Sequence, residues 1–330
     1  MWRCRISALV ITLIALSGSA TAQTSATQTS PTQTWPSKPI RVIVPFSAGS
    51  GTDIVARTVA EQLSTQLGQT IIVENRLGAG GTIGVGSVAK AEPDGHTLLV
   101  HSTTHVVTAS TYSNPGYDTA RDFAGITPLV SLPNVLVVKP NKYKTVKDLV
   151  DAAKAARGSM NYASAGAGSA AHLNGERFRL ATGVDVQHIP YKGGPEGLTA
   201  IMTGDVDFYF IPLPAARGLV AAGKLAVIAV SGSTRASALP DVPTTVEAGF
   251  PNSEYNFWVG MFAPAATPKA IVERLNAETV KALNDPAVKE KLAKVGGDTL
   301  PMKPAEFDAF VKKEIDVNAA LVKAAKIQPN

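Results

Sequence analysis

Short apolar runs alternate with amphipathic segments along most of the chain. The run Ile40–Val44 is typical of a buried strand. Apolar residues then recur every fourth position from Val55 to Leu67, which predicts a helix over 52–67. Further strands are expected at 71–73, 97–100, 134–139, 161–164, 184–189, 206–210 and 225–230. Further helices are expected to end at 91, to begin near 145, 169, 195 and 213, and to span 268–283, 286–295 and 304–326.

This alternation of strand and helix predicts an α/β fold. Repeated strand–helix units favour parallel sheets with helices on both faces. Two such blocks, about 40–125 and 130–250, precede a helical tail and indicate two α/β lobes. The 330 residues also suit two domains, because a single core rarely grows past roughly 250–300 residues. Ligands of open α/β sheets bind beyond the carboxyl ends of the strands, where the strand order reverses.

The first residues have the organisation of a signal peptide. Met1–Arg5 is cationic, and Ile6–Leu16 is apolar but shorter than the roughly 20 residues that a membrane span needs. Ala20–Ala22 offers small residues for cleavage after Ala22, so export to the periplasm is predicted. An uncleaved anchor is the alternative. Residues 23–36, rich in Thr, Gln and Ser, are expected to form a flexible leader.

Composition and charge exclude several classes of protein. Hydrophobic residues make up 45% of the chain and charged residues 17%, which argues against a disordered chain or a coiled coil. The net charge of +5 is scattered, so we expect no nucleic-acid partner. Cys4, the single cysteine, falls in the predicted signal peptide, so the mature chain would have neither a disulfide nor a thiol nucleophile.

Motifs of the common enzyme classes are absent from the sequence. There is no P-loop, no complete G-x-G-x-x-G, no G-x-S-x-G and no H-E-x-x-H. His101 and His105 stand four apart at the end of a strand, which favours ordinary hydrogen-bonded histidines over a metal site. Asp53 could act as an acid, but it also suits a helix cap. We therefore predict no enzyme activity, no cofactor and no metal.

Three turns between strand and helix consist of Gly, Ser, Thr and Ala. They are Ser47–Asp53, Ser102–His105 and Ser164–Ser169. Backbone N–H groups, hydroxyls and helix N-termini together suit an anion such as a carboxylate. Plain helix capping is the alternative for any one loop, and the presence of three in two lobes favours a small-anion cleft.

Longer motifs surround these turns. They are Pro45–Asp53 with Ala56-Arg57, Val73–Arg76, Gly78–Gly84, Ala89-Lys90, Pro93–Gly95, His188–Gly193, Gly204–Asp207 and Leu239–Thr244. In this order they resemble, over nearly the whole mature chain, the Bug-type receptors, which are the substrate-binding proteins of tripartite tricarboxylate transporters.

The resemblance implies a periplasmic-binding-protein (Venus flytrap) fold. One domain would combine 37–127 with 253–330, the other would comprise 128–252, and crossing strands would form the hinge. The chain would capture a small organic acid between the domains and, as a monomer, deliver it to the subunits of a membrane transporter. A ligand-sensing subunit for a signalling partner is an alternative, as is an exported hydrolase or isomerase using Asp53, His105 or Asp207.

The resemblance also implies a set of ligand-binding residues from both lobes. They are Phe46, Ser47, Ser50, Thr52, Asp53, Ser102, Thr103, Ser164, Gly166, Ala167, Gly168, Ser169, Tyr191 and Asp207. Ser50 replaces the second glycine of the usual pair, and Leu77 stands where the family usually has Pro. The segment Phe208–Phe210 would supply aromatic contacts or belong to the core. An aromatic acid and an aliphatic dicarboxylate both fit these residues.

Overall fold

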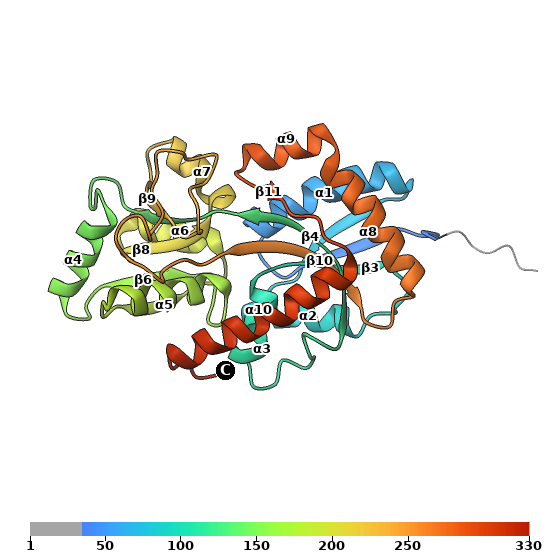
Figure 1. The fold of residues 1–330 in the computed structure, drawn as a ribbon, viewed down its shortest axis with the longest axis horizontal. Helices are drawn as coiled ribbons and strands as arrows, with labels where there is room; N and C mark the ends of the chain where they lie inside the picture. The colour runs from blue at the N-terminus through green and yellow to red at the C-terminus, as the bar shows by residue number, and fades with distance from the viewer. Residues whose placement is uncertain (1–34, 330) are drawn as a thin grey trace, which may run out of the picture. The chain divides into compact units, whose positions relative to one another are not determined.

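Two β-sheets with their covering helices make up residues 35–329, the part of the chain that the computed structural model describes (Figure 1). The predicted signal peptide, its cleavage site and residues 23–34 of the leader lie outside the described residues. We call the part built on the first sheet lobe 1 and the part built on the second sheet lobe 2.

Lobe 1 contains a six-stranded mixed sheet in the order β11-β4-β10-β3-β1-β2. Its strands are β1 (Ile40–Val44), β2 (Ile71–Asn75), β3 (Thr97–Ser102), β4 (Phe123–Leu132), β10 (Phe257–Pro264) and β11 (Asp298–Thr299). β1 runs parallel to β2 and β3, whereas β10 runs antiparallel to β3 and β4.

Lobe 2 contains a five-stranded sheet in the order β7-β6-β8-β5-β9. Its strands are β5 (Asn134–Val138), β6 (Asn161–Ser164), β7 (Gln187–Pro190), β8 (Phe208–Pro212) and β9 (Ala226–Val230). β6 runs parallel to β7 and β8, and β5 runs antiparallel to β8 and β9.

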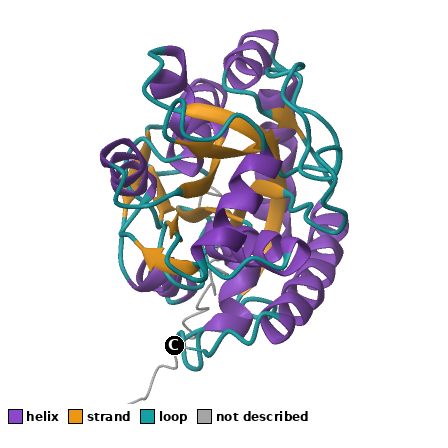
Figure 2. Ribbon diagram, turned by 90° about the vertical axis from the view of Figure 1, so that its left-hand side faces the viewer, coloured by secondary structure: helices purple, strands orange, loops and turns teal. Residues whose placement is uncertain are grey.

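Helices cover the sheets of both lobes (Figure 2). Those of lobe 1 are α1 (Gly51–Leu67), α2 (Thr82–Ala89), α3 (Thr104–Thr111), α8 (Lys269–Asn284), α9 (Pro286–Lys294) and α10 (Pro304–Ala324), with a 3₁₀ turn at Ala79–Gly81. Those of lobe 2 are α4 (Val146–Ala156), α5 (Ala170–Thr182), α6 (Gly194–Thr203) and α7 (Leu213–Ala221). Among the described residues, no helix combines the length and apolar character that crossing a membrane requires.

The predicted α/β fold with two lobes is confirmed, but the prediction of parallel sheets is wrong for part of each sheet. β4 and β10, which pair antiparallel along their length, were not predicted. The chain passes from lobe 1 to lobe 2 after β4 and returns before β10 (Figure 1). These passages lie close to the predicted domain limits at 127/128 and 252/253, which stay a prediction.

Alternation along β8 decides the place of three consecutive aromatic residues. Phe208 and Phe210 face the core that α4 covers, while Tyr209 and Ile211 face the opposite side of the sheet. Successive side chains of a strand point to opposite faces, so one strand supplies both cores. Phe208 and Phe210 are therefore core residues, and only the middle ring is available to the cleft.

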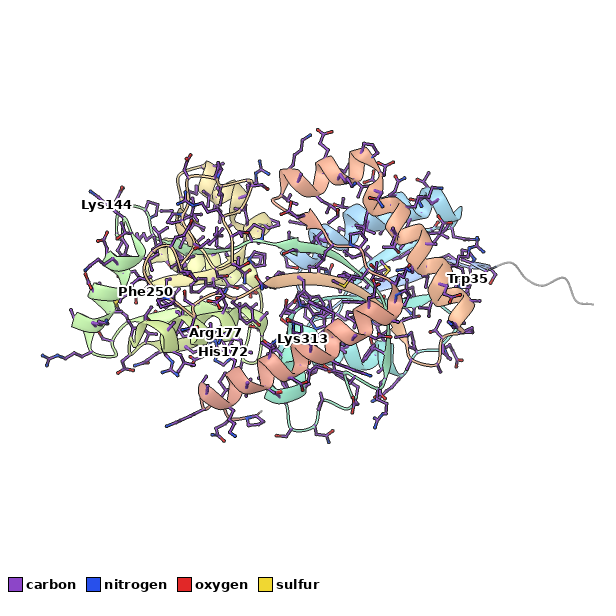
Figure 3. All side chains as sticks on the ribbon, in the orientation of Figure 1. Trp35, Lys144, His172, Arg177, Phe250 and Lys313 are labelled. Atoms are coloured by element: carbon purple, nitrogen blue, oxygen red, sulfur yellow. The ribbon has the colours of Figure 1, made fainter. Side chains whose placement is uncertain are left out.

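Trp35 and Pro36, which we assigned to the leader, pack against lobe 1. The Trp35 ring lies 5.9 Å from the ring of His96 and beneath the guanidinium of Arg274, which also donates a hydrogen bond to the Trp35 carbonyl. Figure 3 shows Trp35 at the edge of lobe 1 that faces away from lobe 2. The folded part of the chain thus begins before the expected end of the leader.

Candidate ligand-binding site

The strand order reverses once in each sheet. In lobe 1, β2 and β3 lie on opposite sides of β1, and in lobe 2, β7 and β8 lie on opposite sides of β6. The loops that leave the carboxyl ends of strands at such a point diverge and open a crevice. Here the loops after β1 and β3 meet those after β6, β7 and β8 in a single cavity.

This cavity, the inner chamber, has a volume of about 40 Å³. It is lined from lobe 1 by Phe46, Ser50, Gly51, Thr52, Ser102, Thr104 and Phe257, and from lobe 2 by Ala165, Ser169, Ala171, Gly194, Tyr209, Ile211, Pro212 and Ala215. Of the predicted site residues, Phe46, Ser50, Thr52, Ser102 and Ser169 line it. None of its lining side chains is charged.

Helix N-termini supply the electrostatics of the inner chamber. α1, α3 and α5 all begin at residues that line the chamber or lie next to one. The first N–H groups of a helix have no partner within the helix, and its dipole places partial positive charge at that end. Hydroxyls of Ser50, Thr52, Ser102 and Ser169 stand at the same surface. The chamber is therefore suited to an anion without any basic side chain.

A second cavity, the outer chamber, has a volume of about 370 Å³. It is lined by Pro45, Phe46, Leu77, Gly78, Ala79, Gly80, Gly81, Ala165, Gly166, Tyr191 and Lys192. The predicted residues Gly166 and Tyr191 belong to this chamber, whereas Phe46 lines both.

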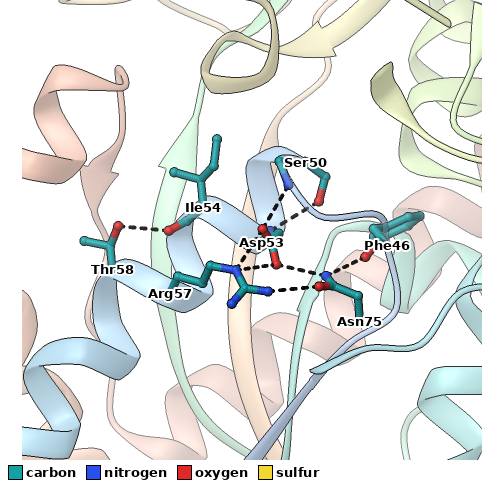
Figure 4. Close-up of polar contacts among 8 residues, drawn as sticks. Phe46, Ser50, Asp53, Ile54, Arg57, Thr58 and Asn75 are labelled. Carbon is teal, nitrogen blue, oxygen red and sulfur yellow. Dashed lines mark hydrogen bonds and ion pairs between the residues drawn. The ribbon is translucent and has the colours of Figure 1, made fainter. Parts of the chain in front are cut away.

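Asp53 holds the loop after β1 from behind (Figure 4). Arg57 Nε donates to both of its carboxylate oxygens, at 3.0 and 3.1 Å, and the Gly49 N–H donates to Oδ2 at 2.9 Å. Asn75 Nδ2 bridges Asp53 Oδ1, at 2.9 Å, and the carbonyl of Phe46, at 2.8 Å. Asp53 is 2% exposed and does not line either chamber, so its carboxylate positions the loop.

Burial raises the pKa of the Asp53 carboxyl, but hydrogen bonds from Arg57, Asn75 and the Gly49 N–H outweigh it and bring the pKa below its ordinary value. The carboxylate therefore stays ionised and fully engaged. A group in this state is a poor proton donor, which argues against Asp53 as a catalytic acid.

Two stacked histidines hold the corresponding loop of lobe 2. The rings of His172 and His188 lie 3.8 Å apart at an interplanar angle of 10°. His172 Nδ1 accepts from the Gly168 N–H at 3.2 Å, and His188 Nε2 lies 2.6 Å from Ser164 Oγ. Burial lowers the pKa of His172 to about 4, and burial together with the neighbouring His172 lowers the pKa of His188 to about 3. Both rings are neutral near pH 7.

Four other predicted residues lie behind the chamber walls. The Thr103 hydroxyl accepts from the Trp258 N–H at 2.9 Å, which ties α3 to β10. Ser164 Oγ accepts from the Gly166 N–H at 3.1 Å and so shapes its own turn. Ala167 and Gly168 present their backbone to lobe 1. None of these four residues lines a chamber.

The structure places Asp207 away from both chambers. Its carboxylate accepts from Lys142 Nζ at 2.6 Å and from the Asn161 N–H at 2.9 Å. Asn161 begins β6 and Ser164 ends it, so Asp207 lies at the opposite end of the strand from the ligand-facing loops. The Asp207 carboxylate thus holds the amino end of β6, and neither chamber is lined by it; a role for Asp207 at the ligand stays a prediction.

The two lobes are in contact across the cleft. Thr104 Oγ1 of lobe 1 accepts from the Ala170 N–H at 2.9 Å, and Tyr112 donates to the Ala167 carbonyl at 3.1 Å. A Cβ at Gly193 would lie 2.5 Å from Ser47 Oγ, so the backbone of lobe 2 reaches lobe 1 only because no side chain intervenes. Ser47 Oγ is buried without a hydrogen-bond partner in the described part of the chain. This arrangement is a closed cleft.

Gly51, Thr104 and Ala165 line the inner chamber from the three predicted turns, and Tyr209 lines it from the segment for which a ligand contact and a core position were both open. The lining residues that the sequence analysis missed are Ala171, Gly194, Ile211, Pro212, Ala215 and Phe257. The alternation of β8 was a usable signal for Tyr209 and Ile211, because they share the face opposite Phe208 and Phe210. Phe257 gave no such signal, since the strand that carries it was not predicted.

The two histidines that the sequence analysis weighed as a metal site lie outside the lining of both chambers. His101 and His105 are fully buried, burial lowers the pKa of both, and neither lines a chamber. The described residues contain no group of three or more His, Cys, Asp or Glu side chains able to hold a metal ion. What the chamber walls offer is hydrogen bonding to an anion.

Comparisons with known proteins agree with this geometry. The model of the tripartite tricarboxylate transporter family receptor matches residues 55–327. A UPF0065 protein encoded in the tcbD-tcbE intergenic region of a Pseudomonas sp. is 36% identical over 96% of this chain and 95% of its own length. Protein BugT of Bordetella pertussis is 33% identical over 94% of this chain and 96% of its own length.

Solved structures extend the similarity to the fold. The periplasmic binding protein BugD has a TM-score of 0.85 at 34% identity, covering 90% of this chain and 100% of its own. Rpa4515 of R. palustris, solved with adipate, has a TM-score of 0.87 at 32% identity with the same coverage. MatC of Rhodopseudomonas palustris, solved with malate, has a TM-score of 0.82 at 32% identity, covering 87% and 100%. This chain belongs to the receptor family of the tripartite tricarboxylate transporters.

Proposed function

We propose that the chain is an extracytoplasmic solute receptor that captures a small organic acid in the cleft between its lobes and delivers it to a tripartite tricarboxylate-type membrane transporter. The observation that carries the proposal is the inner chamber. It gathers helix N-termini and hydroxyls from both lobes around a space without charged side chains.

A carboxylate matches this chamber in charge and in hydrogen bonding. Its oxygens accept hydrogen bonds and carry the negative charge that helix N-termini favour. No lining carboxylate would repel it, because Asp53 is engaged with Arg57 and Asn75 behind the loop. Neutral solutes of the same size would gain only the hydrogen bonds.

Capture requires that the ligand prefers the closed cleft. A ligand shifts the balance between open and closed forms only by its difference in affinity for the two. An acid in the inner chamber contacts Ser50 of lobe 1 and Ser169 of lobe 2, and both contacts exist only when the lobes meet. We infer binding without chemical change, since no side chain at the chamber is arranged as a nucleophile with a base.

The relatives support the proposed ligand class and setting. Rpa4515 was solved with adipate and MatC with malate, and both acids support a carboxylate for this chain. We propose a periplasmic monomer whose signal peptide is removed after Ala22. Its domains would be 37–127 with 253–330, and 128–252, so that the closed pair is the form presented to the membrane subunits.

A thermal-shift screen tests this function. The mature protein from Gln23 is heated with aliphatic dicarboxylates, tricarboxylates, amino acids and aromatic acids. A ligand at about one hundred times its Kd stabilises the fold by about 2.7 kcal/mol, which raises Tm by several degrees. A hit recovered unchanged supports a receptor, whereas turnover of the acid contradicts it. If no acid shifts Tm, mass spectrometry of the denatured sample must reveal a retained acid, or the proposal fails.

A pair of cap variants locates the site. Ser169 Oγ caps α5 at the inner chamber, and Thr145 Oγ1 caps α4 in the same lobe away from both chambers. Each alanine variant loses about 1 kcal/mol of stability through its cap. Only Ser169→Ala should also weaken binding of the acid found in the screen, by about tenfold. Equal affinities for the two variants would contradict the placement of the carboxylate.

A further inference from the structure

The inner chamber is the smaller of two neighbouring cavities, with about 40 Å³ against about 370 Å³ for the outer chamber. If a carboxylate occupies the inner chamber, as proposed above, the outer chamber offers the larger space for the rest of the molecule.

The outer chamber adjoins the inner one. Phe46 and Ala165 line both cavities, which therefore lie next to each other. The outer chamber offers about 370 Å³, and its walls include Leu77, the Gly78–Gly81 backbone and Tyr191. An acid held by one end in the inner chamber would therefore extend past Phe46 into the outer chamber.

Lys192 is the one charged residue among those lining either chamber. It stands in the loop after β7, which the Tyr191 N–H fixes to the carbonyl of Ser164 at 3.0 Å. Its side chain is exposed and forms no ion pair within residues 35–329. Lys192 thus lines the space that a bound acid would enter.

We propose that Lys192 determines ligand specificity by pairing with a second, distal acid group of an elongated ligand whose first carboxylate occupies the inner chamber. The inference rests on the proposed function and adds a subsite to it. The inner chamber recognises one carboxylate in any acid, and the outer chamber selects acids with an anionic group at the far end. The Lys192 ammonium distinguishes an acid with an anionic far end from an acid of the same length with a neutral far end, because the other residues that line the outer chamber carry no charge.

Matched pairs of acids test the subsite. Straight-chain dicarboxylates from succinate to suberate are titrated calorimetrically against the monocarboxylates of the same carbon number, such as adipate against hexanoate. Lys192→Met keeps an unbranched side chain, one atom shorter, and removes its charge. Lys224→Met is the control, since Lys224 is an exposed lysine of lobe 2 that lines neither chamber.

The expected result is a Kd for the best dicarboxylate that rises about three- to tenfold in Lys192→Met, with monocarboxylate affinity unchanged and with no change in Lys224→Met. The difference should shrink as the salt concentration rises. The subsite is contradicted if Lys192→Met loses the same affinity for monocarboxylates as for dicarboxylates. It is also contradicted if the unsubstituted protein binds a monocarboxylate as tightly as the dicarboxylate of the same carbon number. Either result leaves the receptor function standing. If no acid of any type binds, the receptor function itself fails.

Discussion

The ligand-facing loops of the two lobes resemble each other in sequence but are held in place differently. The lobe 1 loop, Phe46–Asp53, is fixed within its own lobe by the Asp53–Arg57–Asn75 network. The lobe 2 loop, Ser164–His172, is held by neutral histidines and also forms hydrogen bonds across the cleft: the Ala170 N–H donates to Thr104 Oγ1, and Tyr112 donates to the Ala167 carbonyl.

The difference indicates an order of events. The lobe 1 loop has its supports whether the cleft is open or closed, so it is formed in advance and can receive the acid. The lobe 2 loop gains part of its supports only when the lobes meet, so closure completes it. Ligand and closure then favour the same state, as a capture mechanism requires.

Loss of the Asp53–Arg57–Asn75 network, which holds the lobe 1 loop, should have the largest effect on stability and on ligand affinity. Asp53→Ala leaves the Gly49 N–H and Arg57 Nε without their acceptor and removes one of the two acceptors of Asn75 Nδ2, and we expect a loss of about 2–3 kcal/mol in the free energy of unfolding. Ligand affinity should fall with it. Asp122→Asn, which breaks an ion pair with the exposed Arg121, should cost less than about 1 kcal/mol. Similar urea midpoints for the two variants would show that the lobe 1 loop is held by other contacts.

Acid should weaken the lobe 2 support before the lobe 1 support. The folded pKa values of His172, about 4, and His188, about 3, lie below the ordinary value, so the unfolded chain takes up protons first as pH falls below about 6.5. Each histidine then removes up to about 1.4 kcal/mol of stability per pH unit until its folded pKa is reached. Asp53, whose pKa is lowered, contributes stability that is lost only below pH 3.8.

Non-titrating replacements isolate this contribution. His172→Asn retains an acceptor for the Gly168 N–H, and His188→Gln retains a partner for Ser164 Oγ. The double variant should show a shallower loss of unfolding free energy between pH 6.5 and 4, while His101 and His105 continue to contribute. An unchanged slope would mean that the stacked pair does not titrate as described.

A substitution that blocks closure of the cleft should weaken the supports of the lobe 2 loop and leave those of the lobe 1 loop intact. Gly51 begins α1 without a left-handed φ, and a Cβ there would lie 2.9 Å from Pro212 Cβ of lobe 2. Gly51→Ala should therefore keep the fold and weaken binding of the acid at least tenfold, because the closed state is disfavoured. Gly218→Ala in α7, where no atom lies within 4 Å, is the control.

Hydrogen exchange gives the decisive comparison for that variant. In Gly51→Ala, protection of the Ala170 amide should decrease, while protection of the Gly49 amide should persist. Loss of protection at both amides, or unaltered affinity, would contradict an independent lobe 1 loop.

The sequence predicted the parts of this architecture that depend on local pattern. The turns of Gly, Ser, Thr and Ala contain four of the predicted residues that line the inner chamber, including Ser50 and Ser169, whereas Phe46 came from the resemblance to the family. Sequence patterns did not predict the strands whose pairing partners are distant along the chain. β4 and β10 pair only across more than a hundred residues, and neither has the strand–helix–strand context that made the other strands recognisable.

Site roles were confused for a related reason. A polar residue near a turn looks the same in sequence whether it faces the ligand or holds the loop from behind. Asp53 and Thr103 belong to the second kind, because their partners Asn75 and Trp258 come from other strands. Asp207 is the last residue of Gly204–Asp207, one of the motifs that carry the resemblance to the family. Its hydrogen bond from the Asn161 N–H places it at the amino end of β6, opposite the ligand-facing loops.

The smallest effect is expected at the hydrogen bond that lobe 1 gives to the lobe 2 loop. Tyr112 donates to the Ala167 carbonyl across the cleft, whereas the hydroxyl of Tyr117 lies 3.2 Å from Thr108 Oγ1 within lobe 1. Each Tyr→Phe change removes one bond of about 0.5–1.5 kcal/mol. Tyr112→Phe should raise the Kd of the acid about two- to tenfold and leave the unfolding free energy of the open form nearly unchanged, because its bond exists only in the closed state. Tyr117→Phe should lower stability and leave Kd unchanged. If the two variants reversed these outcomes, the lobe 2 loop would be formed without closure, and the difference between the loops would disappear.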